Sequence, residues 1–561
     1  MSLPLLATGV IALLYFGYRY YGGFIARQYQ LDDNTVTPAV AVNDGVDFVP
    51  TRPFYLLGQH FSAIAAAGPI AGPIMAGQQF GWLPAILWIG FGVILIGAVH
   101  DFSTLVASVR HGGKSIAEVI RAQLGKSAWL AITVFIWLAL IYVIVAFTDV
   151  TASTFVSGDV ELKGLEQGHW NPGGAVAMAA LLYMVLSVVL GFVERFLKPP
   201  LWLTTVIFVP ATLVAVWLGT QLSTVITLGA STWAVLILAY CFVASMTPVW
   251  ALLQPRGYLG GFVLYLAIGA GVIGIFFGGF EVVQPALSTT PPSPTNPMFP
   301  FLFVTIACGA CSGFHGLVCS GTTSKQIEKE THCHPVGFGA MLLEGFVAVI
   351  ALTTVMIATT EQLAGKGPGA VYGQGLGQFL TVLIGKDNLL FATTFGAMAF
   401  STFVFDTLDV STRLGRYILQ ELLGLQSRAG AVLATAITCA VPLMFVLMSG
   451  PGAYRAYWTL FGTSNQLLAG LSLLGISVWL KRSGKRYWYT LCPMIFVLTI
   501  TLWSLVLQIK AAFGADSPTN VQIINGVVSI TLLGLAAALI VFGVRALLEP
   551  AGSRGDLQPV S

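Results

Sequence analysis

The sequence predicts an all-α polytopic membrane protein with a five-plus-five inverted-repeat (LeuT-like) core, in which two membrane helices are interrupted near their centres. Its mean hydropathy is +0.84 and only 9% of its 561 residues are charged, values foreign to a soluble globular protein of this size. Apolar runs of about 20 residues, enough to cross a bilayer, recur along the chain. Two of them, residues 54–78 and 232–254, carry glycine or proline at mid-length.

Fifteen apolar runs are long enough to span the membrane. They cover residues 3–21, 54–78, 82–109, 129–155, 174–193, 201–219, 232–254, 258–280, 299–321, 335–358, 389–412, 430–449, 456–480, 487–511 and 520–547. In the alternating loops that this count creates, 21 of the 26 Lys and Arg residues fall on one side. Because cytoplasmic loops are enriched in Lys and Arg, the N-terminus is expected outside and the C-terminus in the cytoplasm. A short helix over 371–384 is expected on the outer surface.

The two interrupted runs are expected to form a binding site. Proline lacks an N–H group and clashes with the preceding turn, and glycine is flexible, so a helix unwinds where they cluster. Unwound backbone survives at membrane depth only where it lines a cavity or is buried in protein, and paired interruptions mark transporter binding sites. The residues concerned are Gly68, Pro69, Gly72 and Pro73 in the first run, and Ser245, Thr247 and Pro248 in the second.

The spacing of the interruptions also predicts how the chain is organised. The two runs lie five helices apart and cross the membrane in opposite directions, as an inverted repeat requires. The expected parts are an N-terminal helix and cytoplasmic loop (1–53), a first repeat (54–219), a second repeat (220–429) and C-terminal accessory helices (430–561).

Polar and aromatic side chains near the interruptions complete the expected substrate site. Ser312 and His315 lie within one turn of the run 299–321, which an inverted repeat places beside the same cavity. The N-termini of the half-helices carry partial positive charge, so a small carboxylate can bind there without arginine. The remaining expected contacts are Gln59, His60, Trp250 and Phe314.

Ionisable residues inside the expected spans are candidates for ion coupling, because they are costly in a bilayer. Five of them fall between mid-membrane and the cytoplasm, as a proton path leading inward would require: His100, Asp101, Glu344, Asp406 and Asp409. The alternatives are structural. His100 and Asp101 could be a polar contact between helices, and Asp406 and Asp409 could form ion pairs with Arg413 and Arg416, which follow on the same helix.

A metal site is the weaker interpretation of one further pattern. Cys308, Cys311, His315 and Cys319 line one face of a helix, and thiolate and imidazole ligands suit zinc or copper. Zinc sites usually draw close-spaced pairs from two elements, and cysteine on a membrane helix is often only a packing residue. We therefore expect no bound metal and no other cofactor.

Several longer stretches make the chain recognisable. They are residues 53–61, 248–250, 254–259, 312–315, 320–325 and 405–416. In these stretches the chain resembles the carbon starvation protein A family of bacterial transporters, and the match extends over most of the membrane region. The resemblance implies kinship with the amino acid–polyamine–organocation superfamily and uptake of peptides or pyruvate, with protons as the coupling ion.

Together these observations predict a secondary transporter of the bacterial inner membrane, not an enzyme. It would import pyruvate, short peptides or both by alternating access. Sodium remains the alternative coupling ion, and the oligomeric state stays open. No feature suggests nucleic-acid binding; the expected partners are the lipid bilayer and a small-molecule substrate. Two other functions are a nutrient-sensing receptor with a transporter-like fold, and a metal-binding membrane redox protein.

Overall fold

The fold is described from a computed structural model that covers residues 2–45, 47–156, 160–161, 169–288, 297–425, 427–450 and 452–549. One short antiparallel pair joins β1 (Val160–Glu161) to β2 (His169–Trp170), and all other named elements of the described ranges are helices. Within these described ranges, eleven helices are long and apolar enough to cross a membrane. The prediction of an all-α polytopic membrane protein is therefore confirmed.

Each of the fifteen expected spans coincides with helical structure. The first half contains α1 (Leu3–Phe16), η1 (Gly17–Gly22), α2 (Gly23–Tyr29), α3 (Pro38–Val42), α4 (Pro53–Ile64), α5 (Gly68–Phe80), α6 (Trp82–Gly92), η2 (Val93–Gly97), α7 (Ala98–Arg110), α8 (Ile116–Leu124), α9 (Lys126–Thr154), α10 (Pro172–Phe192), η3 (Val193–Leu197), α11 (Leu201–Gln221), α12 (Ala230–Met246), η4 (Val249–Ala251) and α13 (Leu253–Phe277).

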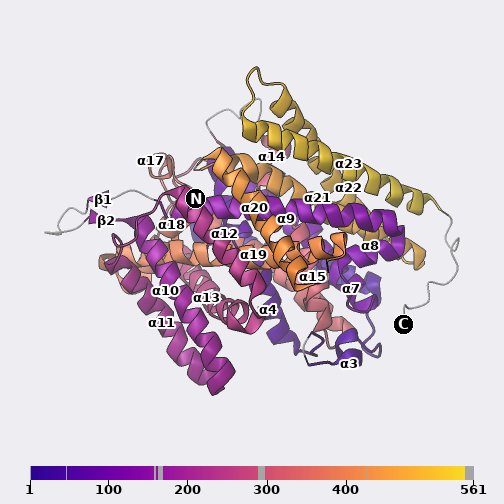
Figure 1. Ribbon diagram of the computed structural model, residues 1–561, viewed down its shortest axis with the longest axis horizontal. Coiled ribbons are helices and arrows are strands. Elements are labelled where there is room, and N and C mark those ends of the chain that lie inside the picture. Colours follow the sequence, from indigo (N-terminus) through magenta and orange to yellow (C-terminus); the bar gives the residue numbers. More distant parts are fainter. Residues whose placement is uncertain are drawn as a thin grey trace.

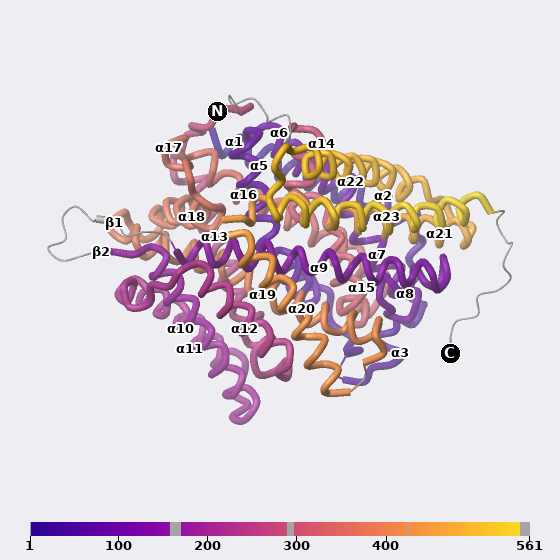
Figure 2. The backbone as a smooth tube through the Cα atoms, turned by 45° about the horizontal axis from the view of Figure 1, so that its top comes forward, coloured from indigo at the N-terminus to yellow at the C-terminus, as the bar shows by residue number. Residues whose placement is uncertain are grey.

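The second half contains α14 (Met298–Thr305), α15 (Gly313–Gly321), η5 (Thr323–Lys325), η6 (Glu330–His332), η7 (His334–Gly339), α16 (Ala340–Met356), α17 (Thr360–Leu363), α18 (Pro368–Ile384), η8 (Lys386–Asn388), α19 (Leu389–Leu423), α20 (Arg428–Ser449), α21 (Tyr454–Arg482), α22 (Trp488–Phe513) and α23 (Asn520–Leu548). In both views α10 and α11 lie at one side of the molecule, and α22 and α23 lie at another, with α9 between them (Figures 1 and 2).

The first interruption is confirmed, although it begins slightly earlier than the glycine–proline pattern indicates. Helix α4 ends at Ile64 and α5 starts at Gly68, so the chain unwinds over residues 65–67. Pro69 occupies the first turn of α5, where its missing N–H group would have had no helical partner. Pro73 lies inside α5 without ending it.

The second interruption is not where the sequence pattern placed it. Helix α12 ends at Met246 and α13 starts at Leu253, so residues 247–252 connect two separate helices instead of interrupting one. The interrupted helix is the run 298–321, in which α14 ends at Thr305 and α15 starts at Gly313. The prediction of an interruption inside a helix at Ser245–Pro248 was wrong, because Pro248 lies just beyond the end of α12. The interruption that the structure shows, residues 306–312, contains no proline.

Helices of the first half pack on helices of the second half in reciprocal pairs, as a two-fold relation between two repeats would produce. Helix α5 packs on α16 while α15 packs on α7, and α9 packs on α20 while α19 packs on α10. Helices α9 and α19 also pack on each other. This pattern relates α4–α5 to α14–α15. The division of the repeats at residues 219 and 220 stays a prediction.

The short helix expected over 371–384 is also present, as α18. It does not lie loosely on a surface, because it packs against α13, α16 and α19, and side chains such as Tyr372 and Phe379 are fully buried. Helix α18 therefore belongs to the helical core.

Candidate functional site

The two interruptions meet each other, which places the unwound backbone of both helices at one point in the fold. A Cβ atom on Gly68 would lie 2.4 Å from the Cys308 sulfur, and one on Gly72 would lie 2.6 Å from the Thr305 carbonyl oxygen. Such distances are too short for any side chain, so glycine at these positions lets the two segments approach closely.

Side chains from distant helices satisfy the carbonyl groups that the second interruption leaves free. Trp88 on α6 donates its indole N–H to the Ile306 carbonyl at 3.1 Å. From α21, Trp458 donates to the Thr305 carbonyl at 3.1 Å and Gln466 to the Phe303 carbonyl at 2.8 Å. Unpaired buried carbonyls would be costly, so these three donors stabilise the break without help from proline.

Asn465 on α21 joins both sides of the second interruption. Its side-chain N–H₂ group lies 3.1 Å from the Ser312 hydroxyl and 3.2 Å from the Cys308 sulfur. Its carbonyl oxygen accepts from the backbone N–H of Phe314 at 2.9 Å, in the first turn of α15. Asn465 was not predicted, because it lies far along the chain from the glycine–proline interruptions; a polar amide within an apolar span was the available signal.

His315 and two carboxylates form a buried chain across three helices. The His315 Nδ1 atom lies 2.9 Å from Asp101 Oδ2 on α7, and its Nε2 atom lies 3.2 Å from Glu344 Oε2 on α16. His100 Nδ1 contacts the other Asp101 oxygen at 2.7 Å. All four side chains are at most 1% exposed. Three predicted coupling residues are thus brought together, with His315, which was expected to bind substrate, between the two acids.

The protonation of this chain follows from its geometry. A neutral imidazole can donate a hydrogen bond at only one of its two nitrogens. With a carboxyl group at each nitrogen, either the ring carries both protons or one carboxyl group carries a proton. In either case the Asp101–His315–Glu344 chain carries a proton that offsets part of its negative charge, in a place where net charge is expensive.

His60 is buried near the same helix, whereas its neighbour Gln59 is exposed. The His60 Nδ1 atom lies 2.9 Å from the Thr323 hydroxyl, and its Nε2 atom lies 3.8 Å from the Cys319 sulfur. His60 thus connects α4 to the far end of α15. Of the two predicted substrate contacts Gln59 and His60, the structure brings only His60 toward the helix that carries His315.

Asp406 and Asp409 belong to a second, separate cluster. Arg256 on α13 donates to Asp406 at 2.8 Å and to Asp409 at 2.6 Å, and it also contacts the Tyr240 hydroxyl. Arg256 is 1% exposed, although the sequence placed it in a loop. The alternative of pairing with Arg413 was wrong, because that side chain bonds the carbonyl groups at the end of α12.

The residues of the misplaced interruption lie at the connection between α12 and α13. The carbonyl groups of Ser245 and Thr247 accept from Arg416 and Arg413 of α19, which cap the end of α12. Pro248 precedes the short helix η4. Trp250 packs between Phe192 and Phe196 of α10 and η3. These contacts are with α10, η3 and α19, not with the residues of either interruption.

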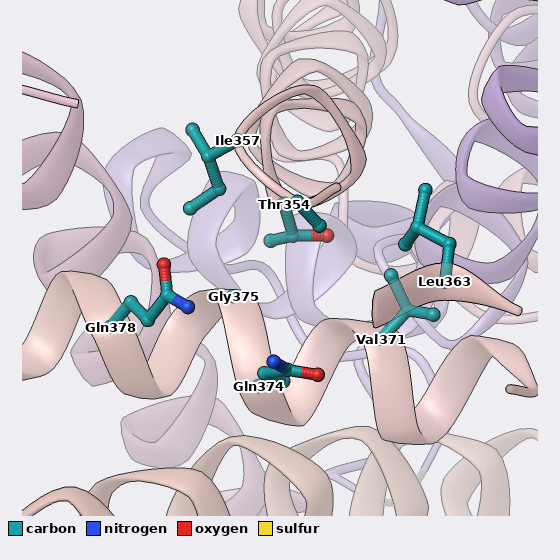
Figure 3. A pocket seen from close by; sticks show the side chains of 8 residues that line it. Thr354, Ile357, Leu363, Val371, Gln374, Gly375 and Gln378 are labelled. Carbon is teal, nitrogen blue, oxygen red and sulfur yellow. The ribbon is translucent and has the colours of Figure 1, made fainter. Parts of the chain in front are cut away.

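A small apolar cavity borders the second interruption. It lies between α9, α15 and α21, and its lining includes Phe314, Leu317, Asn465 and Leu468. Its volume is about 10 Å³, room for about one water molecule. A second hollow between α16 and α18 holds no water-sized space; Gln374, Gln378 and Thr354 line it (Figure 3). Only the first hollow touches the predicted site residues.

The weak metal candidates do not converge. Both ring nitrogens of His315 face carboxylates, and Cys311 and Cys319 are buried thiols. Within the described ranges, no three His, Cys, Asp or Glu side chains are arranged to hold a metal ion.

Interrupted helices that face each other, next to a buried relay of acids and histidine, define a polytopic membrane protein of the transporter type. The sequence profile of the family described as "Carbon starvation protein CstA" matches residues 2–365 and 354–504. The chain belongs to this family.

Individual relatives agree over most of the chain. The peptide transporter CstA of Campylobacter jejuni is 34% identical, over 89% of this chain and 79% of its own length. That of Bacillus subtilis is 31% identical over 97% of both chains. The pyruvate/proton symporter BtsT of Escherichia coli is 30% identical, over 91% of this chain and 83% of its own.

Among solved structures, the likenesses are remote. A manganese transporter of Eremococcus coleocola, in complex with an aromatic bis-isothiourea substituted compound, is 15% identical with a TM-score of 0.45, covering 89% of this chain and 97% of its own. MhsT in complex with L-phenylalanine is 13% identical with a TM-score of 0.44, covering 87% and 98%.

Proposed function

We propose that the protein is a proton-coupled secondary transporter that imports a small carbon source, pyruvate or a short peptide, across the bacterial inner membrane. The observation that supports this most is the Asp101–His315–Glu344 relay, because its histidine lies on the interrupted helix α15. A proton entering or leaving the relay would change the charge on the helix that borders the substrate site. Relatives named as a peptide transporter and as a pyruvate/proton symporter support the same function.

The N-terminus of α15 is the better place for the carboxylate of such a substrate. Helix α5 begins Gly68-Pro69 and so lacks one backbone donor in its first turn, whereas α15 begins Gly313-Phe314-His315 without proline. Because the Phe314 N–H group is bonded to Asn465, the N–H groups of Gly313 and His315 would bind the carboxylate. Backbone N–H groups at a helix start and the helix dipole both favour an anion. The apolar cavity beside Phe314 has room for about one water molecule, so it would have to widen to take the uncharged part of the substrate.

Uptake into proteoliposomes tests this function directly. Labelled pyruvate and labelled dipeptides are compared with an inward proton gradient, an inward sodium gradient, and no gradient. We expect accumulation of at least one substrate with the proton gradient. If neither substrate accumulates under any gradient, the proposal is wrong. Accumulation driven only by the sodium gradient would show that sodium, not the proton, is the coupling ion.

Glu344→Gln separates coupling from transport as such. The amide keeps the shape of the side chain but cannot bind and release a proton. We expect gradient-driven uptake to fall much more than exchange of labelled for unlabelled substrate. Glu361→Gln, at the start of the exposed helix α17, is the matched control and should leave both rates unchanged. Equal loss of uptake and exchange in Glu344→Gln would indicate a structural role.

A further inference from the structure

Residues 30–45 and 47–52, here called the strap, lie between α2 and α4 and are bound to the chain that follows α15. That second segment, residues 322–332, is here called the rim. The backbone N–H of Asp32 donates to the Glu330 carboxylate at 3.0 Å, and Asp33 accepts from the Thr331 hydroxyl at 2.8 Å. Further along, Val49 donates to the Lys325 carbonyl at 3.2 Å. The strap is thus bound to the rim at both of its ends.

The charges of the two segments are complementary. The strap contains four acids, Asp32, Asp33, Asp44 and Asp47, and one base, Arg52. The rim contains two acids, Glu328 and Glu330, and two bases, Lys325 and Lys329, and the further bases Arg110, Lys114 and Lys485 in its surroundings make this edge basic in sum. Asp47 lies 3.7 Å from Lys325, and the Lys325 ammonium also lies over the Phe48 ring. An acidic segment therefore covers a basic edge of the helix bundle.

Glu330 is the central contact of this interface. Arg110, the last residue of α7, donates to its two carboxylate oxygens, each at 2.8 Å, and the Glu330 side chain is only 2% exposed. Arg110 also donates to the Tyr29 carbonyl at 3.1 Å, and Lys485, between α21 and α22, donates to the same carbonyl at 2.8 Å. One network therefore joins α7, the rim, the start of the strap and the α21–α22 connection.

The rim is a short continuation of the interrupted helix. Thr323, which contacts His60, lies only two residues beyond the end of α15 at Gly321. Alternating access moves one bundle of helices against another around a fixed site. If α15 and the rim shift relative to α7, the contacts of Glu330 with Arg110 and Asp32 must separate, because Glu330 lies on the rim while Arg110 lies on α7 and Asp32 on the strap.

We propose that the strap is a latch that holds the end of α15 closed, and that the Arg110–Glu330 ion pair must open in each transport cycle. Glu330 then acts as a positioning residue, remote from the substrate. This inference rests on the proposed transport function. The Arg110–Glu330 contact would close the site on the side that is cytoplasmic in the predicted topology.

A reversible disulfide tests the latch. The side chains of Thr51 and Gln326 approach to 3.5 Å, so Thr51→Cys/Gln326→Cys places two thiols across the strap and the rim. Oxidation should abolish uptake and reduction should restore it. Ser477→Cys/Thr490→Cys, whose native hydroxyl oxygens lie 2.8 Å apart, joins α21 to α22 and is the control that should stay active. Full uptake with the strap cross-linked would overturn the proposal.

A second measurement does not need transport. Cys308 is a partly exposed free thiol at the second interruption, and its reaction with a maleimide in detergent reports opening of the site. In a Cys492→Ser background, Glu330→Gln should raise the labelling rate about tenfold, the change expected for loss of one charge-assisted hydrogen bond. Glu328→Gln is the matched control, since only its backbone contacts the strap.

The outcomes separate the two proposals. If the wild-type protein transports nothing but Glu330→Gln is labelled faster, the results support the latch and contradict the transport function. If the wild-type protein is active but the two variants are labelled at equal rates, the results contradict only the latch. Slower labelling in Glu330→Gln also contradicts it.

Discussion

Substitution of Gly68 by alanine tests whether the two interruptions touch. The new methyl carbon would lie 2.4 Å from the Cys308 sulfur and 2.6 Å from its Cβ atom, whereas unstrained contacts between carbon atoms are about 3.5–4.0 Å. Overpacking of this kind costs about 1–3 kcal/mol. Since about 1.4 kcal/mol is a factor of ten, the ratio of folded to unfolded protein should fall by roughly 5- to 150-fold. Denaturant titration of the detergent-solubilised protein measures this change.

A second substitution shows whether Cys308 is the cause. Cys308→Gly removes both clashing atoms, so Gly68→Ala/Cys308→Gly should be more stable than the sum of the two single changes predicts, by about 1–3 kcal/mol. Gly9→Ala is the control, because nothing lies within 4 Å of its Cβ position. Additive effects within about 0.5 kcal/mol would refute the close approach of the two helices.

Three further changes test other parts of the structure. Asn465→Leu leaves the Phe314 N–H group without its acceptor, so the free energy of unfolding should fall by about 1–3 kcal/mol in denaturant titrations, the cost of a buried unpaired donor. Arg256→Met leaves a buried carboxylate unpaired and should cost about 3–5 kcal/mol of unfolding free energy, with partial recovery when Asp409→Asn is added. In the strap, burial acts to raise the pKa of Asp33, but hydrogen bonds from Thr331 of the rim outweigh it and lower that pKa. The Asp33–Thr331 contact is therefore fully formed above the ordinary carboxyl pKa and is lost as the pH falls through the lowered value. Asp33→Asn, which mimics the protonated state at neutral pH, should therefore speed hydrogen exchange of the strap amides.

The sequence was informative about helices and about the first interruption. Each long apolar run coincides with helical structure, because a bilayer imposes a minimum length on the helices that cross it. The cluster from Gly68 to Pro73 marked the region of the first break because its local chemistry disfavours a continuous helix. These features depend on neighbouring residues and can be recognised without knowledge of the fold.

The second interruption could not be found in this way. Residues 306–312 contain a glycine but no proline, and the break is stabilised by donors such as Trp88 and Trp458, which are distant in sequence. Pro248 gave a stronger local signal, yet it lies at the end of a helix. The expectation for Arg256 failed for a similar reason, since its two acidic partners are about 150 residues away.

The two acidic clusters differ in the cation that accompanies them, and this difference favours different roles for them. Arg256 cannot release its proton under physiological conditions, so its contacts with Asp406 and Asp409 form a fixed ion pair that joins α13 to α19. His315 can release a proton, and it lies between two carboxyl groups that can accept one. A coupling path therefore fits the cluster on the interrupted helix, while the cluster around Arg256 fits an anchor against which that helix can move. On this argument Arg256→Met should reduce stability and uptake together, whereas Glu344→Gln should reduce gradient-driven uptake and leave stability nearly unchanged.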